Sequence, residues 1–152
     1  MRLRDADAAD GRFRFRGRPL VSWLLIAALV QLSVRALVGG AALIAAPSGR
    51  IVGLSTDALA RTPFDDYLVP GVVLFVVFGL VSAAVCYGVY AGRKGAPAAA
   101  AAVGLALLGW LAVEALAGFD RPTIWLNLAT AVAALALASR PCVRDGGRGA
   151  DA

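Results

Sequence analysis

Histidine is absent from this chain, and cysteine occurs only as Cys86 and Cys142. Without histidine, the protein lacks the commonest metal ligand and the side chain that most often exchanges protons near neutral pH. The two cysteines form no C-x-x-C motif, which excludes redox enzymes that work through paired cysteines. We expect Cys86 to contribute packing, Cys142 to have no special role, and the protein to need no metal or other cofactor.

Charged residues are almost missing from four long apolar runs, at residues 20–46, 69–91, 98–118 and 123–139. A helix that rises about 1.5 Å per residue needs roughly 20 residues to cross a hydrocarbon core of about 30 Å. The first three runs satisfy this length, and the fourth only just does. None alternates apolar and polar residues as a barrel strand does. The sequence therefore predicts an all-α membrane protein, with four transmembrane helices forming one domain over residues 19–139.

Basic residues lie mostly on one side of this predicted domain. Six arginines precede the first run in the tail 1–18, Arg93 and Lys94 separate the second and third runs, and three arginines follow the fourth in the tail 140–152. Cytoplasmic segments of membrane proteins carry the excess of basic residues. We therefore expect both tails in the cytoplasm and the protein in the cell membrane, and we interpret the net charge of +5 as a topology signal.

The N-terminal tail alternates arginine with phenylalanine from Arg12 to Arg16, and Gly17 and Arg18 follow. Beside a membrane, each cation near anionic headgroups contributes about 1 kcal/mol, so lipid contact is favoured over nucleic-acid binding. The first apolar run is too long for the core of a signal peptide, and Pro47 follows Ala45 and Ala46 directly. We therefore expect no nucleic-acid partner and an uncleaved first helix.

The only long connection, residues 47–68, faces outward in this topology and is rich in apolar residues. We expect it to lie along the membrane interface, with Phe64 and Tyr67 at headgroup depth. Thr62, Pro63 and the two acids that follow are typical of a helix start. Neighbouring helical residues point about 100° apart, so Asp65 and Asp66 are better suited to a helix start than to catalysis or cation binding.

Two ionisable residues lie inside the runs, Arg35 in the first and Glu114 in the third. An ionised side chain at the bilayer centre costs about 2.5–3.5 kcal/mol, so such residues are functional candidates. In the predicted topology both fall in the outer half, and Asn127 lies about one turn into the fourth run. Gln31 and Trp110 each precede a charged residue by four positions and share its helix face. We predict a polar cluster of these five residues.

Our main hypothesis for this cluster is a buried ion pair between Arg35 and Glu114 near the outer end of the bundle. In the alternatives, Arg35 extends to the outer interface, or Glu114 is protonated. Small residues should allow the helices to pack closely, as in Gly88-x-x-x-Gly92, and the pair Gly39–Gly40 suggests a kink or an early end of the first helix.

The sequence also resembles a family of small four-helix bacterial membrane proteins. Three segments carry the resemblance: residues 39–49 (GGAALIAAPSG), residues 53–54 (GL) and residues 62–71 (TPFDDYLVPG), with a looser similarity at Gly109–Trp110 and Glu114. The resemblance implies the same four-helix architecture. It implies no catalytic or ligand-binding residue.

Three function classes follow from these observations. The sequence favours an interaction or accessory membrane protein, with a membrane-protein partner or a second copy of itself. The first alternative is small-ligand binding or transport through the outer polar cluster. The second is an enzyme acting on lipid or an envelope substrate, with Asp65, Asp66 and Glu114 as its only candidate acids and bases. A cavity that joins Arg35 to the outer surface favours ligand binding, and convergence of these carboxylates on one cleft favours the enzyme.

Overall fold

The computed structural model describes residues 14–15, 18–60, 62–118, 122–140 and 143. Most of both predicted tails lies outside the described residues, as do Arg61 and Arg121. The short strands β1 (Arg14–Phe15) and β2 (Arg18–Pro19) pair antiparallel just before the first long helix.

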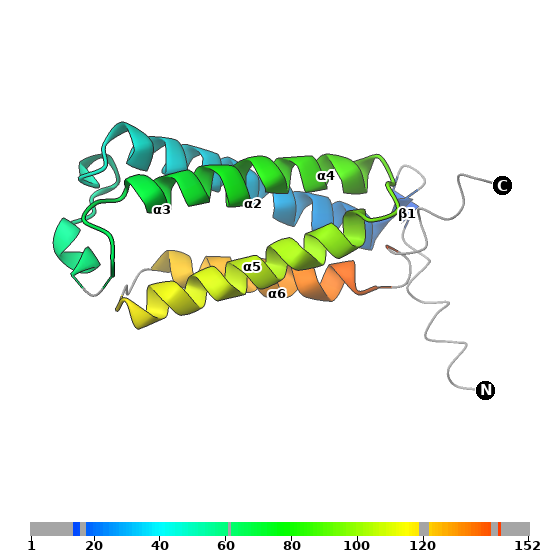
Figure 1. Cartoon of the computed structure of the whole chain (residues 1–152). Helices are drawn as coiled ribbons and strands as arrows, with labels where there is room; N and C mark the ends of the chain where they lie inside the picture. The colour runs from blue at the N-terminus through cyan, green and yellow to red at the C-terminus, as the bar shows by residue number, and fades with distance from the viewer. Residues whose placement is uncertain (1–13, 16–17, 61, 119–121, 141–142, 144–152) are drawn as a thin grey trace.

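Each of the four apolar runs forms a helical rod (Figure 1). The first is α2 (Leu20–Ala45), and the second is built from α3 (Leu68–Val73), η3 (Leu74–Val81) and α4 (Ser82–Tyr90) in unbroken succession. The third is α5 (Ala96–Leu116) and the fourth is α6 (Pro122–Ala138). Three of the rods, Leu20–Ala45, Leu68–Tyr90 and Ala96–Leu116, are long and apolar enough to cross a membrane, while Pro122–Ala138 has 17 residues. The predicted helices are confirmed, with boundaries shifted by only one or two residues.

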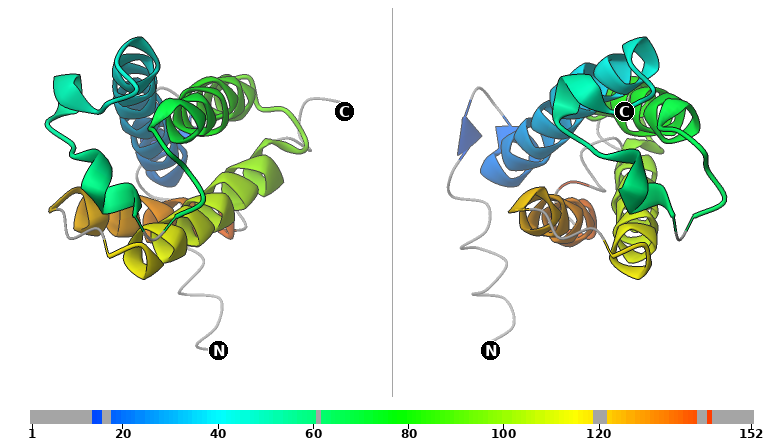
Figure 2. Two further views of the ribbon diagram at one scale, coloured as in Figure 1. Left: turned by 60° about the vertical axis from the view of Figure 1, so that its left-hand side comes forward. Right: turned by 90° about the vertical axis from the view of Figure 1, so that its left-hand side faces the viewer.

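The rods pack as two pairs. In one pair α2 lies along α3, η3 and α4, and in the other α5 lies along α6. Contacts of α2 with α6 and of α4 with α5 join the pairs into a bundle. The start of α2 and the end of α6 lie at one end, whereas the segment after α2, with η1 (Arg50–Val52) and η2 (Thr56–Leu59), crosses the other end (Figures 1 and 2). We call this second end the loop end.

The interior of the bundle is apolar, and so is much of its outside. Leu25, Leu29 and Leu107 are almost completely buried between the helices. At the same time Leu116 is 82% exposed and Trp125 is 72% exposed, and large apolar side chains are exposed on every rod. Water-soluble monomers rarely expose continuous apolar surface of this extent. The exposed apolar surface is therefore compatible with a protein that lies in a membrane.

Two glycines bring α2 into close contact with α3 and the start of η3. A Cβ atom placed on Gly40 would lie 2.6 Å from the backbone nitrogen of Phe75, and one on Gly71 would lie 2.7 Å from the Cβ of Leu43. The helix α2 continues to Ala45, so the expected early end at Gly39–Gly40 is wrong. The G-x-x-x-G pattern does not form a helix-crossing surface, because Gly92 lies beyond α4 in the left-handed conformation, with φ of 68°.

The second rod contains a π-helical segment, η3, in its middle. Such segments widen the helix locally and are frequent at functional sites. Ser33 of α2 donates a hydrogen bond of 2.9 Å to the carbonyl oxygen of Gly79 in η3, which fixes the two helices in register. Leu74 and Phe78 of the same segment point toward the bundle interior and form part of the site described next.

Candidate functional site

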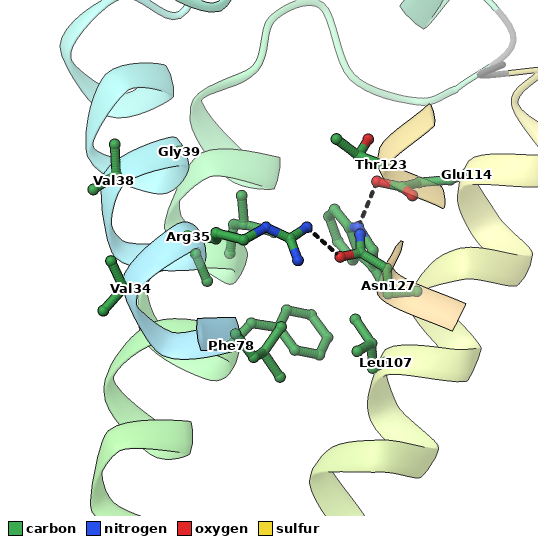
Figure 3. Close-up of a pocket in the computed structure, with 13 residues that line it drawn as sticks. Val34, Arg35, Val38, Gly39, Phe78, Leu107, Glu114, Thr123 and Asn127 are labelled. Carbon is green, nitrogen blue, oxygen red and sulfur yellow. Dashed lines mark hydrogen bonds between the residues drawn. The ribbon is translucent and has the colours of Figure 1, made fainter. Parts of the chain in front are cut away.

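A partly open cavity of about 460 Å³ lies toward the loop end of the bundle, between α2 and η3 on one side and α5 and α6 on the other (Figure 3). Its apolar walls include Leu32, Leu74, Phe78 and Leu107. Its polar lining comes from three helices and consists of Arg35, Trp110, Glu114, Thr123 and Asn127. Four of the five residues of the predicted cluster thus line one cavity.

The Arg35 guanidinium extends from α2 across the cavity toward α6 (Figure 3). Its Nη2 donates to the Oδ1 of Asn127 at 2.6 Å, and its Nη1 donates to the Oε1 of Gln31 at 3.1 Å. Gln31 in turn donates from Nε2 to the Oγ1 of Thr130 at 2.6 Å, and Thr130 donates to the carbonyl oxygen of Leu126 at 2.7 Å. This chain of hydrogen bonds fixes the position of the guanidinium.

Glu114 and Trp110 form a second polar unit on α5. The indole Nε1 of Trp110 donates to the Oε1 of Glu114 at 2.8 Å, one helical turn away. The Trp110 ring also packs edge-to-face on Phe78 of η3, with ring centroids 5.9 Å apart. The indole therefore connects the carboxylate to the apolar wall of the cavity.

The expected direct ion pair between Arg35 and Glu114 does not form. Within the described part of the chain, the hydrogen bonds of the Arg35 guanidinium go to the amide oxygens of Gln31 and Asn127, and no carboxylate lies within ion-pair distance of it. Asn127 of α6 accepts a hydrogen bond from the guanidinium instead, while the Glu114 carboxylate accepts one from Trp110. Among the described residues, the hydrogen bonds of the Arg35 guanidinium thus go only to neutral groups.

Sequence reasoning did not identify Thr123 and Thr130 as part of the site. Thr123 precedes Asn127 by four positions and Thr130 follows it by three, so helical periodicity places all three on one face of α6. That periodicity was the available signal. The Thr130 hydroxyl completes the hydrogen bonding of Gln31, and Thr123 adds a hydroxyl to the cavity lining.

A second, smaller cavity of about 150 Å³ lies beneath the loop and adjoins the first. The two share Leu74, Trp110 and Glu114. Tyr67, one of the predicted loop residues, lines this second cavity and is 3% exposed. Its remaining walls are almost entirely apolar and include Leu43, Leu54, Leu59, Phe64, Val113 and Ala117.

Asp65 and Asp66 lie outside both cavities. Asp65 is exposed, and Asp66 Oδ1 accepts a hydrogen bond of 2.9 Å from the backbone nitrogen of Leu68, the first residue of α3. The helix therefore begins at Leu68, and the expected start at Thr62 is wrong. Among the described residues, no group of three or more acidic, cysteine or histidine side chains is close enough to hold a metal ion.

The fold and the cavity together define a class: an all-helical bundle with three helices long and apolar enough to cross a membrane, containing a polar cavity near one end. Comparison of the chain with protein families, curated proteins and solved structures found no match. The function is therefore inferred from the chemistry of the cavity.

Proposed function

We propose that this chain is an integral membrane protein of the cell membrane, with four membrane-crossing helices and both tails in the cytoplasm. The lengths of three rods and the apolar side chains around the bundle support this proposal. The fourth rod, α6, has 17 residues, which is the lower end of the range that spans a bilayer. The distribution of arginines supports the proposed direction of the helices.

In this orientation the cavity lies on the outer side. The helix α2 enters the membrane from the cytoplasm at Leu20, so Arg35 lies about 22 Å along it, beyond the bilayer centre. The loop end of the bundle, with η1 and η2, then faces outward. The second cavity lies between this loop and the cavity that contains Arg35.

We propose further that the outer cavity binds a small molecule carrying an anionic group, with Arg35 as its main contact. One observation carries this proposal: a partly buried guanidinium at the wall of an apolar bundle is held by two neutral amide oxygens and makes no ion pair with a described carboxylate. A guanidinium has five N–H donors in a planar fork that matches carboxylate or phosphate. Charge-assisted hydrogen bonds of this kind are about twice as strong as neutral ones.

The two other function classes receive less support. Asp65 and Asp66 do not line the cavity, so among the described residues an enzyme would have Glu114 as the single carboxylate in it. An accessory protein needs a surface for a partner, and the apolar exterior is equally well explained by lipid. The protein could bind a ligand and also belong to a larger membrane assembly with a partner or a second copy of itself, so the two functions are compatible.

Methyl phosphate binding to the full chain in lipid nanodiscs tests the proposal. We expect Arg35→Gln to weaken binding at least tenfold, because a hydrogen bond to a charged group contributes about 1.5–3 kcal/mol. Arg50→Gln is the matched control, since Arg50 is exposed in η1 and should leave the affinity unchanged. Thermal unfolding shows whether both proteins are folded. Equal affinities of the folded wild type and the folded Arg35→Gln variant for methyl phosphate would contradict the proposal. Uptake of methyl phosphate by proteoliposomes then separates transport from binding.

A further inference from the structure

We propose that the ligand is an amphiphile: its anionic group binds Arg35 in the first cavity, and a short apolar chain occupies the second cavity beneath the loop. This inference rests on the proposed function and names the ligand class. The two cavities adjoin at Leu74, Trp110 and Glu114, so one molecule can extend through both. Their linings suit the two parts of an amphiphile. The first contains the polar side chains of Arg35 and Asn127, and the second is largely aliphatic and aromatic.

The roof of the second cavity is held in place by specific hydrogen bonds. The Tyr67 hydroxyl donates to the carbonyl oxygen of Ser55 at 2.8 Å, and the Tyr67 backbone nitrogen donates to the carbonyl oxygen of Pro47 at 2.9 Å. Leu59 and Tyr67 pack with Leu43 of α2 in a small apolar cluster of their own. The second cavity is therefore preformed, so a bound chain would not have to order the loop.

The junction between the cavities adds a further chemical preference. Glu114 lines both, and its carboxylate accepts a hydrogen bond from Trp110 at the boundary. A carboxylate has about four lone-pair sites, so it can accept a ligand donor in addition to its protein partners. A hydroxyl, amide N–H or ammonium group between the anionic group and the chain of the ligand would place a donor next to Glu114 and add a hydrogen bond to the binding that the two cavities provide.

A series of alkyl phosphates tests this inference on the full chain in nanodiscs, with partition into empty nanodiscs subtracted. Each buried methylene contributes about fourfold in affinity, so hexyl phosphate should bind more than tenfold tighter than methyl phosphate. In Ala117→Phe the new ring fills the second cavity and should abolish this gain while methyl phosphate binds as before. Ala115→Phe is the control, since Ala115 is exposed and does not line the cavity, and it should keep the gain.

The outcomes separate this inference from the proposed function. Two results would overturn the amphiphile proposal but support the anion site, provided that methyl phosphate binding depends on Arg35. In the first, longer alkyl chains do not increase the affinity. In the second, they increase it equally in the wild type and in Ala117→Phe. Absence of any phosphate binding would overturn both. If Ala117→Phe does not fold, Val113→Phe fills the same cavity from one turn earlier on α5.

A lipid and a soluble compound share the chemistry of an anionic group on an apolar chain. Lysophosphatidate in phosphatidylcholine nanodiscs, followed by native mass spectrometry, distinguishes these sources. Retention of lysophosphatidate that is lost in Arg35→Gln and in Ala117→Phe identifies a membrane lipid as the source. Chain-length-dependent binding of hexyl phosphate without such retention identifies a soluble compound from the outer aqueous phase. Failure of both arms overturns the inference.

Discussion

The close contact between α2 and α3 predicts opposite effects for substitutions at two adjacent glycines. In Gly40→Ala the new methyl group would lie 2.6 Å from the nitrogen of Phe75 and 2.8 Å from both the Cα of Phe75 and the carbonyl oxygen of Gly71. These are backbone atoms, so the helices must separate. In Gly39→Ala the new methyl group meets only the Cδ2 of Leu74, at 3.4 Å, which is ordinary van der Waals contact.

The magnitudes follow from two opposing terms. Replacing glycine by alanine within a helix stabilises it by about 0.5–1 kcal/mol, because less conformational freedom is lost on folding. Overpacking a well-packed contact costs about 1–3 kcal/mol. We therefore expect Gly39→Ala to raise the free energy of unfolding by about 0.5–1 kcal/mol. Gly40→Ala should lower it by about 1–2 kcal/mol, and Gly71→Ala should behave in the same way, since its methyl group would lie 2.7 Å from the Cβ of Leu43.

Unfolding of each variant by sodium dodecyl sulfate in mixed micelles measures these differences. Gly109→Ala serves as a further control, because nothing lies within 4 Å of a Cβ at that position on α5. The double variant of Gly40 and Gly71 should lose less stability than the sum of the single losses, since one separation of the helices relieves both clashes. If the Gly40→Ala protein is as stable as the Gly39→Ala protein, the close contact of Gly40 with the backbone of Gly71 and Phe75 would be refuted.

Two further predictions concern polar groups inside the bundle. Ser82 is completely buried, and its Oγ has no hydrogen-bond partner among the described residues, so Ser82→Ala should stabilise the protein by about 0.5–1 kcal/mol. Ser33→Ala removes the hydrogen bond to Gly79 and should destabilise the protein by a similar amount in the same unfolding titration. If Ser82→Ala also destabilises the protein, the result would argue against an unpaired Ser82 hydroxyl. Glu114→Gln keeps an oxygen that accepts from Trp110 but removes a negative charge from the cavity, so methyl phosphate should bind severalfold tighter by calorimetry. Weaker binding in this variant would show that the carboxylate does not oppose the anion.

The helices were predictable from the sequence because long apolar runs impose them almost independently of tertiary contacts. The packing between helices was not. Gly39 and Gly40 look alike in the sequence, but only Gly40 faces the backbone of α3 and η3. The π-helical segment at Leu74–Val81 likewise has no local signal in its run of apolar residues.

In the site, contacts within one helix were easier to predict than contacts between helices. The spacing of four residues predicted that Gln31 and Arg35 share a helix face, as do Trp110 and Glu114, and each pair forms a hydrogen bond. Depth alone put Arg35, Glu114 and Asn127 at one level, but it could not decide which acceptor reaches the guanidinium. That choice depends on how α6 and α5 are rotated about their axes, and Asn127 of α6 makes the contact.

Thiol labelling from outside intact cells tests whether the Arg35 cavity opens outward and prefers anions. The residue labelled is Asn127→Cys, beside Arg35, in a background in which Cys86 and Cys142 are replaced by serine. Leu128→Cys is the control for access through the cavity, because Leu128 lies at the same depth but outside the cavity lining and is partly exposed on the bundle surface. Ser48→Cys, at an exposed position in the loop, gives the reference rates of reaction.

The reagents are the membrane-impermeant pair of negatively charged sulfonatoethyl and positively charged trimethylammonium-ethyl methanethiosulfonates. We expect Asn127→Cys to react from outside and Leu128→Cys not to react. Relative to Ser48→Cys, the anionic reagent should react faster than the cationic one at position 127, because Arg35 attracts it. Reaction only from the cytoplasmic side, or faster reaction with the cationic reagent, would contradict an outward-facing anion site.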